Sequence, residues 1–147
     1  MLGGLARWLR AAGYDACWQA AIEDWDLIRL ARREGRWLLT LDTGIVRVGI
    51  VRDGEVHALL VPPGLTKREQ LAFVLDRLKL ALRQPRCMAC GGLLAEVSKE
   101  AARDRVPPRS WAGSEQFYEC GRCGKLLWSG THWKEIARVL GEVSARL

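Results

Sequence analysis

The sequence predicts a mixed α/β domain with a parallel sheet, followed by a smaller cysteine-rich segment. Across residues 1–82, stretches with helical spacing of apolar residues alternate with short continuous apolar runs, as in proteins whose helices alternate with buried strands. Gln84 and Pro85 then interrupt the last helical pattern, and two Cys-x-x-Cys pairs follow. A chain of 147 residues accommodates one ordinary domain with a small appendage, so we expect domains at residues 1–82 and 83–147.

The first part of the chain carries signals for two helices and one ambiguous segment. Apolar residues recur at helical spacing over residues 2–9, and Gly13 follows as a stop signal. Residues 14–18 are compatible with a short strand. The second helical pattern covers residues 23–31, where acidic side chains at its start suit the helix dipole, and Gly35 ends it.

Two strands and a third helix complete the first domain. Residues 37–41 form a nearly continuous apolar run, which predicts a buried parallel strand. Asp53-Gly54 lies between flanks rich in valine and isoleucine and predicts a hairpin, whose second strand covers residues 55–61. Thr66 as N-cap with Glu69 three residues later is a capping-box signature, so a helix is expected to begin there.

The cysteine pairs predict a structural zinc site formed by Cys87, Cys90, Cys120 and Cys123. Four thiolates complete the tetrahedral coordination of Zn²⁺ and leave no position for water. A glycine follows the second cysteine of each pair, where the chain must turn with positive φ. A thioredoxin-type redox pair would instead be a single pair at a helix start, whereas an iron-bound ribbon stays an alternative. An amphipathic helix is expected from about Trp133 onward.

Composition and charge narrow the function classes. With 49% apolar and 27% charged residues the chain has a globular profile, and no apolar stretch approaches the ~18 residues of a membrane helix. No signal peptide is evident, so we expect a cytoplasmic protein with reduced thiols, in which Cys17 lies in the core. Residues 1–81 hold 12 Lys and Arg against 10 Asp and Glu, and residues 82–147 hold 11 against 7. This excess suits a polyanion such as RNA, and it equally suits an ordinary basic protein.

Carboxylates mark a candidate catalytic site in the first domain. Asp42 follows the predicted parallel strand, and ligands of open α/β sheets bind beyond the carboxyl ends of strands. Asp24 and Asp26 begin the preceding helix and can converge on the same crevice. Clustered carboxylates bind Mg²⁺ or Mn²⁺, which orients a water and offsets charge on a phosphodiester. The alternative is structural, because acids are common helix caps and turn residues.

Several motifs, in order along the chain, resemble those of one known family. They are Met-Leu-Gly-Gly-Leu-Ala-Arg-Trp-Leu-Arg at residues 1–10, Gly-Tyr-Asp at 13–15, and the segments 24–31, 36–42, 69–71, 86–90, 120–123 and 128–132. In these the sequence resembles the ribonuclease domain of the Mut-seven C-terminal family, a PIN-like domain with a C-terminal zinc ribbon. The resemblance implies a metal-dependent endoribonuclease with acids gathered at the strand ends of a PIN-like sheet.

The resemblance also implies roles for individual residues. Asp24 and Asp42 match the family's acidic positions, and Asp26 falls where the family often has an acid. Thr40 and Arg36 match its strand motif, and Thr40 is expected to hydrogen-bond near the metal. Family members usually begin with a strand ending in an aspartate, ahead of the Met-Leu-Gly segment. We expect that strand and that acid to be absent from the chain as given, which leaves catalysis open and favours a homodimer that covers the exposed sheet edge.

Two function hypotheses therefore compete. In the first, the chain hydrolyses RNA and its basic ribbon contacts phosphates in a salt-dependent manner. The residues expected to make these contacts are Arg86, Arg105, Arg109, Arg122, Lys125 and His132. In the second, the chain is a nucleic-acid-binding zinc ribbon without catalysis, in which Trp111, Tyr118 and Trp128 stack on bases or pack around the metal. A ribbon that binds only protein is a third, weaker hypothesis.

Overall fold

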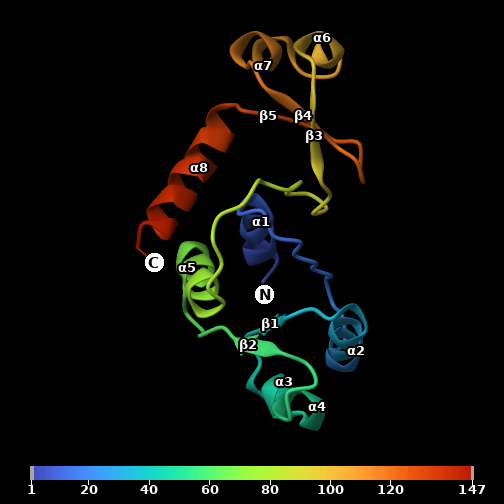
Figure 1. Ribbon diagram of the computed structural model, residues 1–147, viewed down its shortest axis with the longest axis vertical. Coiled ribbons are helices and arrows are strands. Elements are labelled where there is room, and N and C mark those ends of the chain that lie inside the picture. The colour runs from blue at the N-terminus through green and yellow to red at the C-terminus, as the bar shows by residue number, and fades with distance from the viewer. Residues whose placement is uncertain (1, 147) are drawn as a thin grey trace. The chain divides into compact units, whose positions relative to one another are not determined.

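The computed structural model describes residues 2–146, which form two compact units (Figure 1). Unit 1 comprises residues 2–6 and 18–80, and unit 2 comprises residues 7–17 and 81–146. The units therefore place residues 7–17 with the cysteine-containing part of the chain, and the predicted division after residue 82 stays a prediction. Within the described range, no helix is long and apolar enough to cross a membrane.

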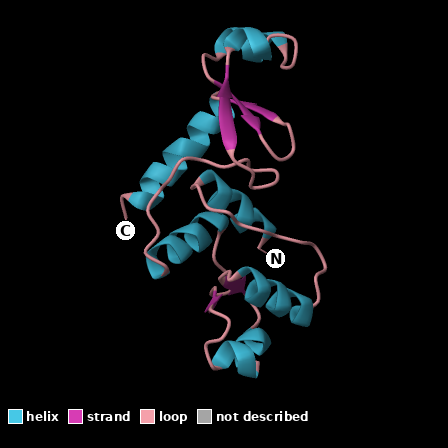
Figure 2. Cartoon of the chain, turned by 45° about the vertical axis from the view of Figure 1, so that its right-hand side comes forward, coloured by secondary structure: helices cyan, strands magenta, loops and turns pink. Residues whose placement is uncertain are grey.

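Unit 1 is a small α/β arrangement around a two-stranded parallel sheet (Figure 2). The first turn of α1 (Gly3–Ala11) belongs to this unit. The other elements of the unit are α2 (Asp24–Glu34), β1 (Leu38–Thr40), α3 (Thr43–Arg47), α4 (Gly49–Arg52), β2 (Ala58–Leu60) and α5 (Lys67–Arg77). Leu38 pairs with Ala58 and Thr40 with Leu60, which confirms the predicted parallel strand. Ile28 of α2 packs with Leu38 and with apolar residues from α3 and α4, and this cluster forms a buried core.

The helix boundaries follow the local signals of the sequence. Gly35 ends α2 in the left-handed conformation, with φ of 62°, and its N–H group bonds back to the carbonyls of the last turn. Thr66 accepts a hydrogen bond from the backbone N–H of Glu69, whose carboxylate accepts one from the backbone N–H of Thr66 at 2.8 Å. The predicted capping box of α5 is therefore confirmed.

The predicted hairpin of the first domain is wrong, although part of the strand expected over residues 55–61 is present as β2. Asp53-Gly54 does not form a hairpin, because residues 43–47 and 49–52 are helical and both N–H groups bond to carbonyls of α4. The flanking Val51 is buried in the core, so its side chain stabilises a short helix instead of a strand. Residues 14–18, which are compatible with a short strand, do not form one: the N–H of Ala16 donates to the carbonyl of Tyr14, and the carbonyl of Ala16 accepts a hydrogen bond from the Arg10 side chain.

Unit 2 contains a three-stranded antiparallel sheet and a long C-terminal helix (Figures 1 and 2). Its elements after residue 80 are β3 (Leu94–Val97), α6 (Lys99–Ala102), α7 (Pro108–Gly113), β4 (Phe117–Cys120), β5 (Leu126–Trp128) and α8 (Thr131–Ser144). Strand order is β3-β4-β5, with Leu94 opposite Cys120. Phe117 is fully buried and packs with Ala102 and Val106, so one face of the sheet has its own apolar core. The predicted C-terminal helix is confirmed.

Candidate functional site

The four paired cysteines of unit 2 converge on one point. Their sulfur atoms all lie within 4.8 Å of one another, and the Cys87–Cys123 and Cys90–Cys120 sulfur pairs are 3.8 Å and 3.4 Å apart. A tetrahedral Zn²⁺ with Zn–S bonds of about 2.3 Å places its sulfurs roughly 3.8 Å apart. The cluster can therefore bind a metal such as zinc. Among the residues that the structure describes, no other group of three or more His, Cys, Asp or Glu side chains presents ligand atoms to a single ion.

The two cysteine pairs sit in turns with the same backbone hydrogen bonds. The N–H groups of Gly91 and Gly124 donate to the carbonyls of Cys87 and Cys120, at 2.7 Å and 2.9 Å. Gly91 and Gly124 have φ of 81° and 70°, which confirms the reason for a glycine after each pair. The N–H groups of Gly92 and Arg122 also donate to sulfur, each at 3.4 Å. Such turns direct all four sulfurs toward one point.

The surroundings of Cys120 favour the thiolate that a metal requires. Burial alone would raise the pKa of this thiol. Hydrogen bonds from the backbone N–H groups of Cys123 and Arg122, and contacts with the Cys90 and Cys123 thiols, outweigh burial and lower the pKa of Cys120 from 9.0 to about 6. The site thus stabilises negative sulfur, the form that coordinates Zn²⁺.

Gly92 is part of this site although the sequence analysis does not single it out. A β-carbon at this position would lie 2.6 Å from the Cys120 sulfur and 2.8 Å from the Arg122 β-carbon. We expect Gly92→Ala to weaken zinc affinity by about 10- to 100-fold, because the second cysteine turn must move away from the first. Competition with a coloured zinc chelator measures this affinity. Gly121→Ala is the matched control, since a β-carbon there would approach only the carbonyl oxygen of Leu93, at 3.9 Å. Equal affinities of the two variants would contradict the expectation.

Arg10 of α1 is the second residue missed at the level of sequence. Its side chain is 8% exposed and donates to the carbonyls of Met88 and Ala89 in the first cysteine turn, both at 3.0 Å. It also donates to Ala16 at 2.7 Å, and its own carbonyl accepts from the N–H of Arg86. Arg10 therefore holds the first cysteine turn against residues 10–16, and all these residues belong to unit 2. Arg10 directly follows the apolar pattern of residues 2–9, and this position gave no signal of its role.

Replacement of Arg10 should destabilise the fold strongly. We expect Arg10→Leu to lower the free energy of unfolding by about 2–4 kcal/mol, because three carbonyls lose a charged donor at a buried position. Urea denaturation of the zinc-loaded protein measures the change. Arg7→Leu removes the same charge from an exposed position of the same helix. Equal losses in the two variants would show that the three hydrogen bonds contribute nothing.

The three candidate acids lie on the surface of unit 1. Asp42 is the N-cap of α3 and accepts a hydrogen bond from the N–H of Gly44 at 2.6 Å. Asp24 and Asp26 lie in the first turn of α2, where Asp26 forms an ion pair with Arg29 at 3.2 Å. Within residues 2–146 these three carboxylates do not form a group that presents three ligand atoms to one ion.

Thr40 and Arg36 occupy opposite ends of β1. Thr40 is buried at the carboxyl end, and its hydroxyl accepts a hydrogen bond from the N–H of Asp42 at 2.9 Å. Arg36 precedes the strand and donates to Glu34 at 2.6 Å, which lowers the pKa of that carboxyl group. Thr40 therefore belongs to the edge that carries Asp42, whereas Arg36 does not. Cys17, which the sequence predicts to lie in the core, is exposed.

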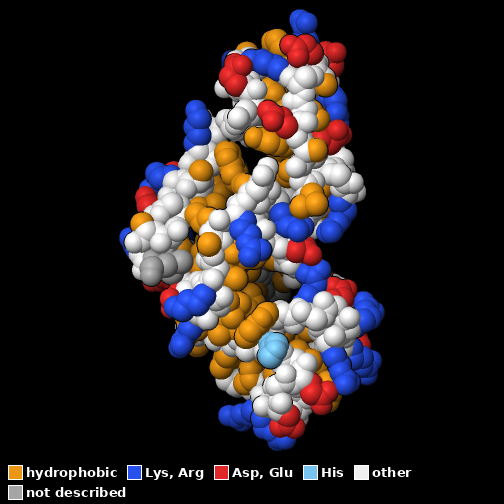
Figure 3. Space-filling model, viewed as in Figure 1, with side chains coloured by type: hydrophobic (Ala, Val, Ile, Leu, Met, Phe, Trp, Pro, Cys, Tyr) orange, Lys and Arg blue, Asp and Glu red, His pale blue; other side chains and the backbone are white. Residues whose placement is uncertain are grey.

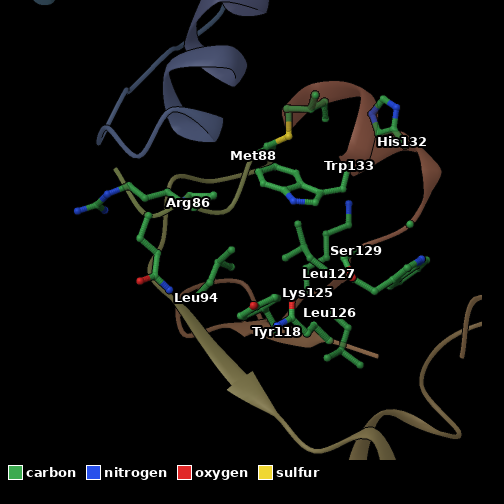
Figure 4. Close-up of a pocket in the computed structure, with 16 residues that line it drawn as sticks. Arg86, Met88, Leu94, Tyr118, Lys125, Leu126, Leu127, Ser129, His132 and Trp133 are labelled. Atoms are coloured by element: carbon green, nitrogen blue, oxygen red, sulfur yellow. The ribbon is translucent and has the colours of Figure 1, made fainter. Parts of the chain in front are cut away.

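Three of the six residues predicted to contact nucleic acid line one cavity of unit 2. These are Arg86, Lys125 and His132, and Figure 4 shows them around the side chains of Trp133 and Tyr118. Tyr118 and Trp128, two of the three aromatic residues expected to stack, line the same cavity. The structure thus gathers residues that lie far apart in the sequence.

The remaining predicted contacts lie outside this cavity. Arg105 forms an ion pair with Glu119, and Arg122 donates to the carbonyl of Cys90 at 2.9 Å. Arg109 is exposed on α7. Trp111 packs on the core around Phe117 and donates to the carbonyl of Lys99 at 2.8 Å, so its ring contributes to the packing of unit 2.

Comparison with known proteins identifies the family. A family model described as Mut7-C RNAse domain matches residues 1–140. Searches of curated proteins and of solved structures give no match. The match spans nearly the whole chain, including both cysteine pairs and the strand that precedes Asp42, and it confirms the resemblance found in the motifs. The chain therefore belongs to the Mut7-C RNAse domain family.

Proposed function

We propose that this chain is a metal-dependent endoribonuclease, with a PIN-like unit 1 and a zinc ribbon in unit 2. The observation that carries the proposal is the family match over residues 1–140, together with the place of Asp42 at the carboxyl end of a parallel strand. In α/β sheets this edge is where ligands bind. The zinc ribbon is supported by four converging sulfurs on two matching turns.

Asp42 is the best candidate for a catalytic residue. One carboxylate oxygen is held by the N–H of Gly44, and the Thr40 hydroxyl accepts from the backbone N–H of Asp42. The carboxylate is thus positioned before substrate arrives, and its second oxygen has no protein donor among the described residues. The first turn of α2 carries Asp24, and α2 connects by a short turn to the amino end of β1. A helix that packs back along the strand brings its first turn toward the edge of Asp42.

A divalent cation can bind at this edge only if the substrate supplies its remaining ligands. Mg²⁺ keeps several waters and commonly binds through one or two carboxylates and substrate phosphates. Asp42 and Asp24 would hold it, and Asp26 would contribute after release from Arg29. The ion would neutralise charge on the phosphodiester and acidify a bound water. The chain itself supplies the fixed orientation of Asp42.

The experiment that tests the proposal is cleavage of a circular single-stranded RNA by the full chain. An endonuclease converts the circle to a linear product, whereas an exonuclease leaves it intact. The protein is loaded with one zinc and dialysed free of other divalent ions, because a chelator would also remove zinc. Linear product that requires added Mn²⁺ supports the proposal. Intact circles with Mn²⁺, in the presence of folded protein, reject it.

A second candidate function is a nucleic-acid-binding protein without catalysis. It is favoured by the state of the acids, because Asp42 caps α3, Asp26 pairs with Arg29, and the three carboxylates do not share one point. In that case the circular RNA stays intact but binds with an affinity that falls as salt rises. The same assay, followed by a binding measurement, separates the two functions.

A further inference from the structure

Unit 2 contains a cavity of about 610 Å³ between its sheet and the start of α8. Leu94 of β3, Tyr118 of β4 and Leu127 of β5 line one side, and Trp133 and Ile136 of α8 line the other. Figure 3 shows a hollow bordered by hydrophobic side chains beside α8, and Figure 4 shows the Trp133 indole directed to the middle of the cavity. The volume lies within the range of about 300–1,000 Å³ that small ligands occupy. The metal and the candidate acids do not account for this cavity.

The charged side chains that line the cavity are basic. Its lining includes Arg86, Lys125 and His132, and none of its sixteen lining residues is acidic. Lys125 and His132 are exposed, and their side chains have no hydrogen bond or ion pair within the described part of the chain. Arg86 donates one N–H to the carbonyl of Gly91 at 2.8 Å, which fixes its direction and leaves further donors. An apolar interior with a cationic rim is complementary to a ligand that has a flat apolar part and a nearby negative charge.

Polar and aromatic groups of the lining favour a nucleobase as the flat part. The side-chain amides of Gln84 and Gln116 and the hydroxyls of Tyr118 and Ser129 line the cavity, and none is hydrogen-bonded to a described residue. Such groups can pair with the edges of a base. The Trp133 ring is half-buried and stacks on no other aromatic ring among residues 2–146. Trp128, by contrast, packs against the Phe117 core and the backbone of Gly130.

We propose that this cavity binds one unpaired nucleobase of single-stranded RNA. The base stacks on Trp133, and its flanking phosphates lie against Lys125, His132 and Arg86. The choice of RNA as the ligand rests on the proposed function, whereas the choice of a base with its phosphates rests on the cavity alone. A lipid chain would leave the amides of Gln84 and Gln116 unused. A hydrophobic acidic peptide is the remaining competitor, and the test distinguishes it.

The first test compares two RNA probes on the full zinc-loaded chain without other divalent ions. One probe is a fluorescein-labelled single-stranded octanucleotide, and the other has the same backbone with abasic sites in place of its central bases. We expect Trp133→Leu to bind the base-containing probe about 5- to 100-fold more weakly than the wild type. Its affinity for the abasic probe should stay within about twofold. Trp37→Leu, which removes an exposed tryptophan from unit 1 at the end of β1 opposite Asp42, is the control and should change neither affinity.

The second test concerns the basic side chains at the edge of the cavity and does not require a substitution in its apolar interior. Lys125→Gln should reduce the slope of log K against log salt by about 0.7, the value for one phosphate contact on a single strand. Lys134→Gln removes the same charge from an exposed position of α8 outside the cavity lining and should leave the slope unchanged. Unchanged affinity of Trp133→Leu for the abasic probe shows that its weaker binding of the base-containing probe does not come from misfolding.

The outcomes separate this inference from the proposed function. If the wild type binds and cleaves RNA but Trp133→Leu and Lys125→Gln behave like their controls, the cavity proposal fails and the ribonuclease proposal stands. Equal affinity of the wild type for both probes would assign the cavity to another ligand, such as a peptide, and overturn the inference. A wild type that neither binds nor cleaves any RNA rejects both proposals.

Discussion

Removal of the metal is expected to unfold unit 2. Small domains of fewer than about 80 residues rarely obtain more than 3–5 kcal/mol from a single core, and structural zinc contributes roughly 10–16 kcal/mol of apparent binding free energy in small zinc peptides. Arg10 of α1 donates hydrogen bonds to the first cysteine turn, and Cys120 is the last residue of β4. Loss of the metal therefore removes contacts that stabilise both α1 and the sheet. We expect chelation of one zinc per chain to abolish the near-ultraviolet circular dichroism of the aromatic residues around Phe117.

The variant Cys120→Ser should reproduce this effect without a chelator. A hydroxyl does not replace the buried thiolate, so the variant should bind zinc weakly and lose its cooperative thermal transition. Cys17→Ser is the matched control, because Cys17 is exposed and lies outside the cluster. A Cys120→Ser protein that unfolds at the temperature of the control would mean that the four cysteines have no structural role.

Local signals explain which elements were predictable. The capping box of Thr66 and Glu69, the stop at Gly35 and the glycines after each cysteine pair all act within five residues, and the structure confirms each of them. The cluster of four sulfurs was predictable as well, since two Cys-x-x-Cys pairs, each followed by a glycine, are typical of a structural zinc site.

The errors arise where a distant partner decides the local structure. Asp53-Gly54 suits a hairpin, yet the apolar residues before it are buried in the core by short helices, and the dipeptide ends α4 instead. Residues 14–18 form no strand, and the hydrogen bond to the Ala16 carbonyl comes from the Arg10 side chain and not from a neighbouring strand. Sequence spacing also did not reveal that Arg86, Lys125 and His132 meet at one cavity, because three different segments supply them.

Substitution of Asp42 should abolish ribonuclease activity while the fold is retained. We expect Asp42→Asn to cleave RNA at least about 100-fold more slowly, because an amide binds a divalent cation poorly and does not act as a base. Asparagine is as good an N-cap as aspartate, so the hydrogen bond to Gly44 and the stability of α3 should persist. Asp53→Asn, at another exposed helix end in unit 1, is the control and should keep full activity.

A single comparison tests whether Asp42 carries ribonuclease activity: the Mn²⁺-dependent cleavage rates of the wild type and of Asp42→Asn, each with one zinc bound and with RNA affinity measured on the same samples. We expect cleavage by the wild type, a loss of at least about 100-fold in the variant, and RNA affinities that agree within a few-fold. Equal cleavage by both proteins would remove Asp42 from the site. No cleavage by either, with RNA still bound, would contradict the ribonuclease assignment and leave a binding protein.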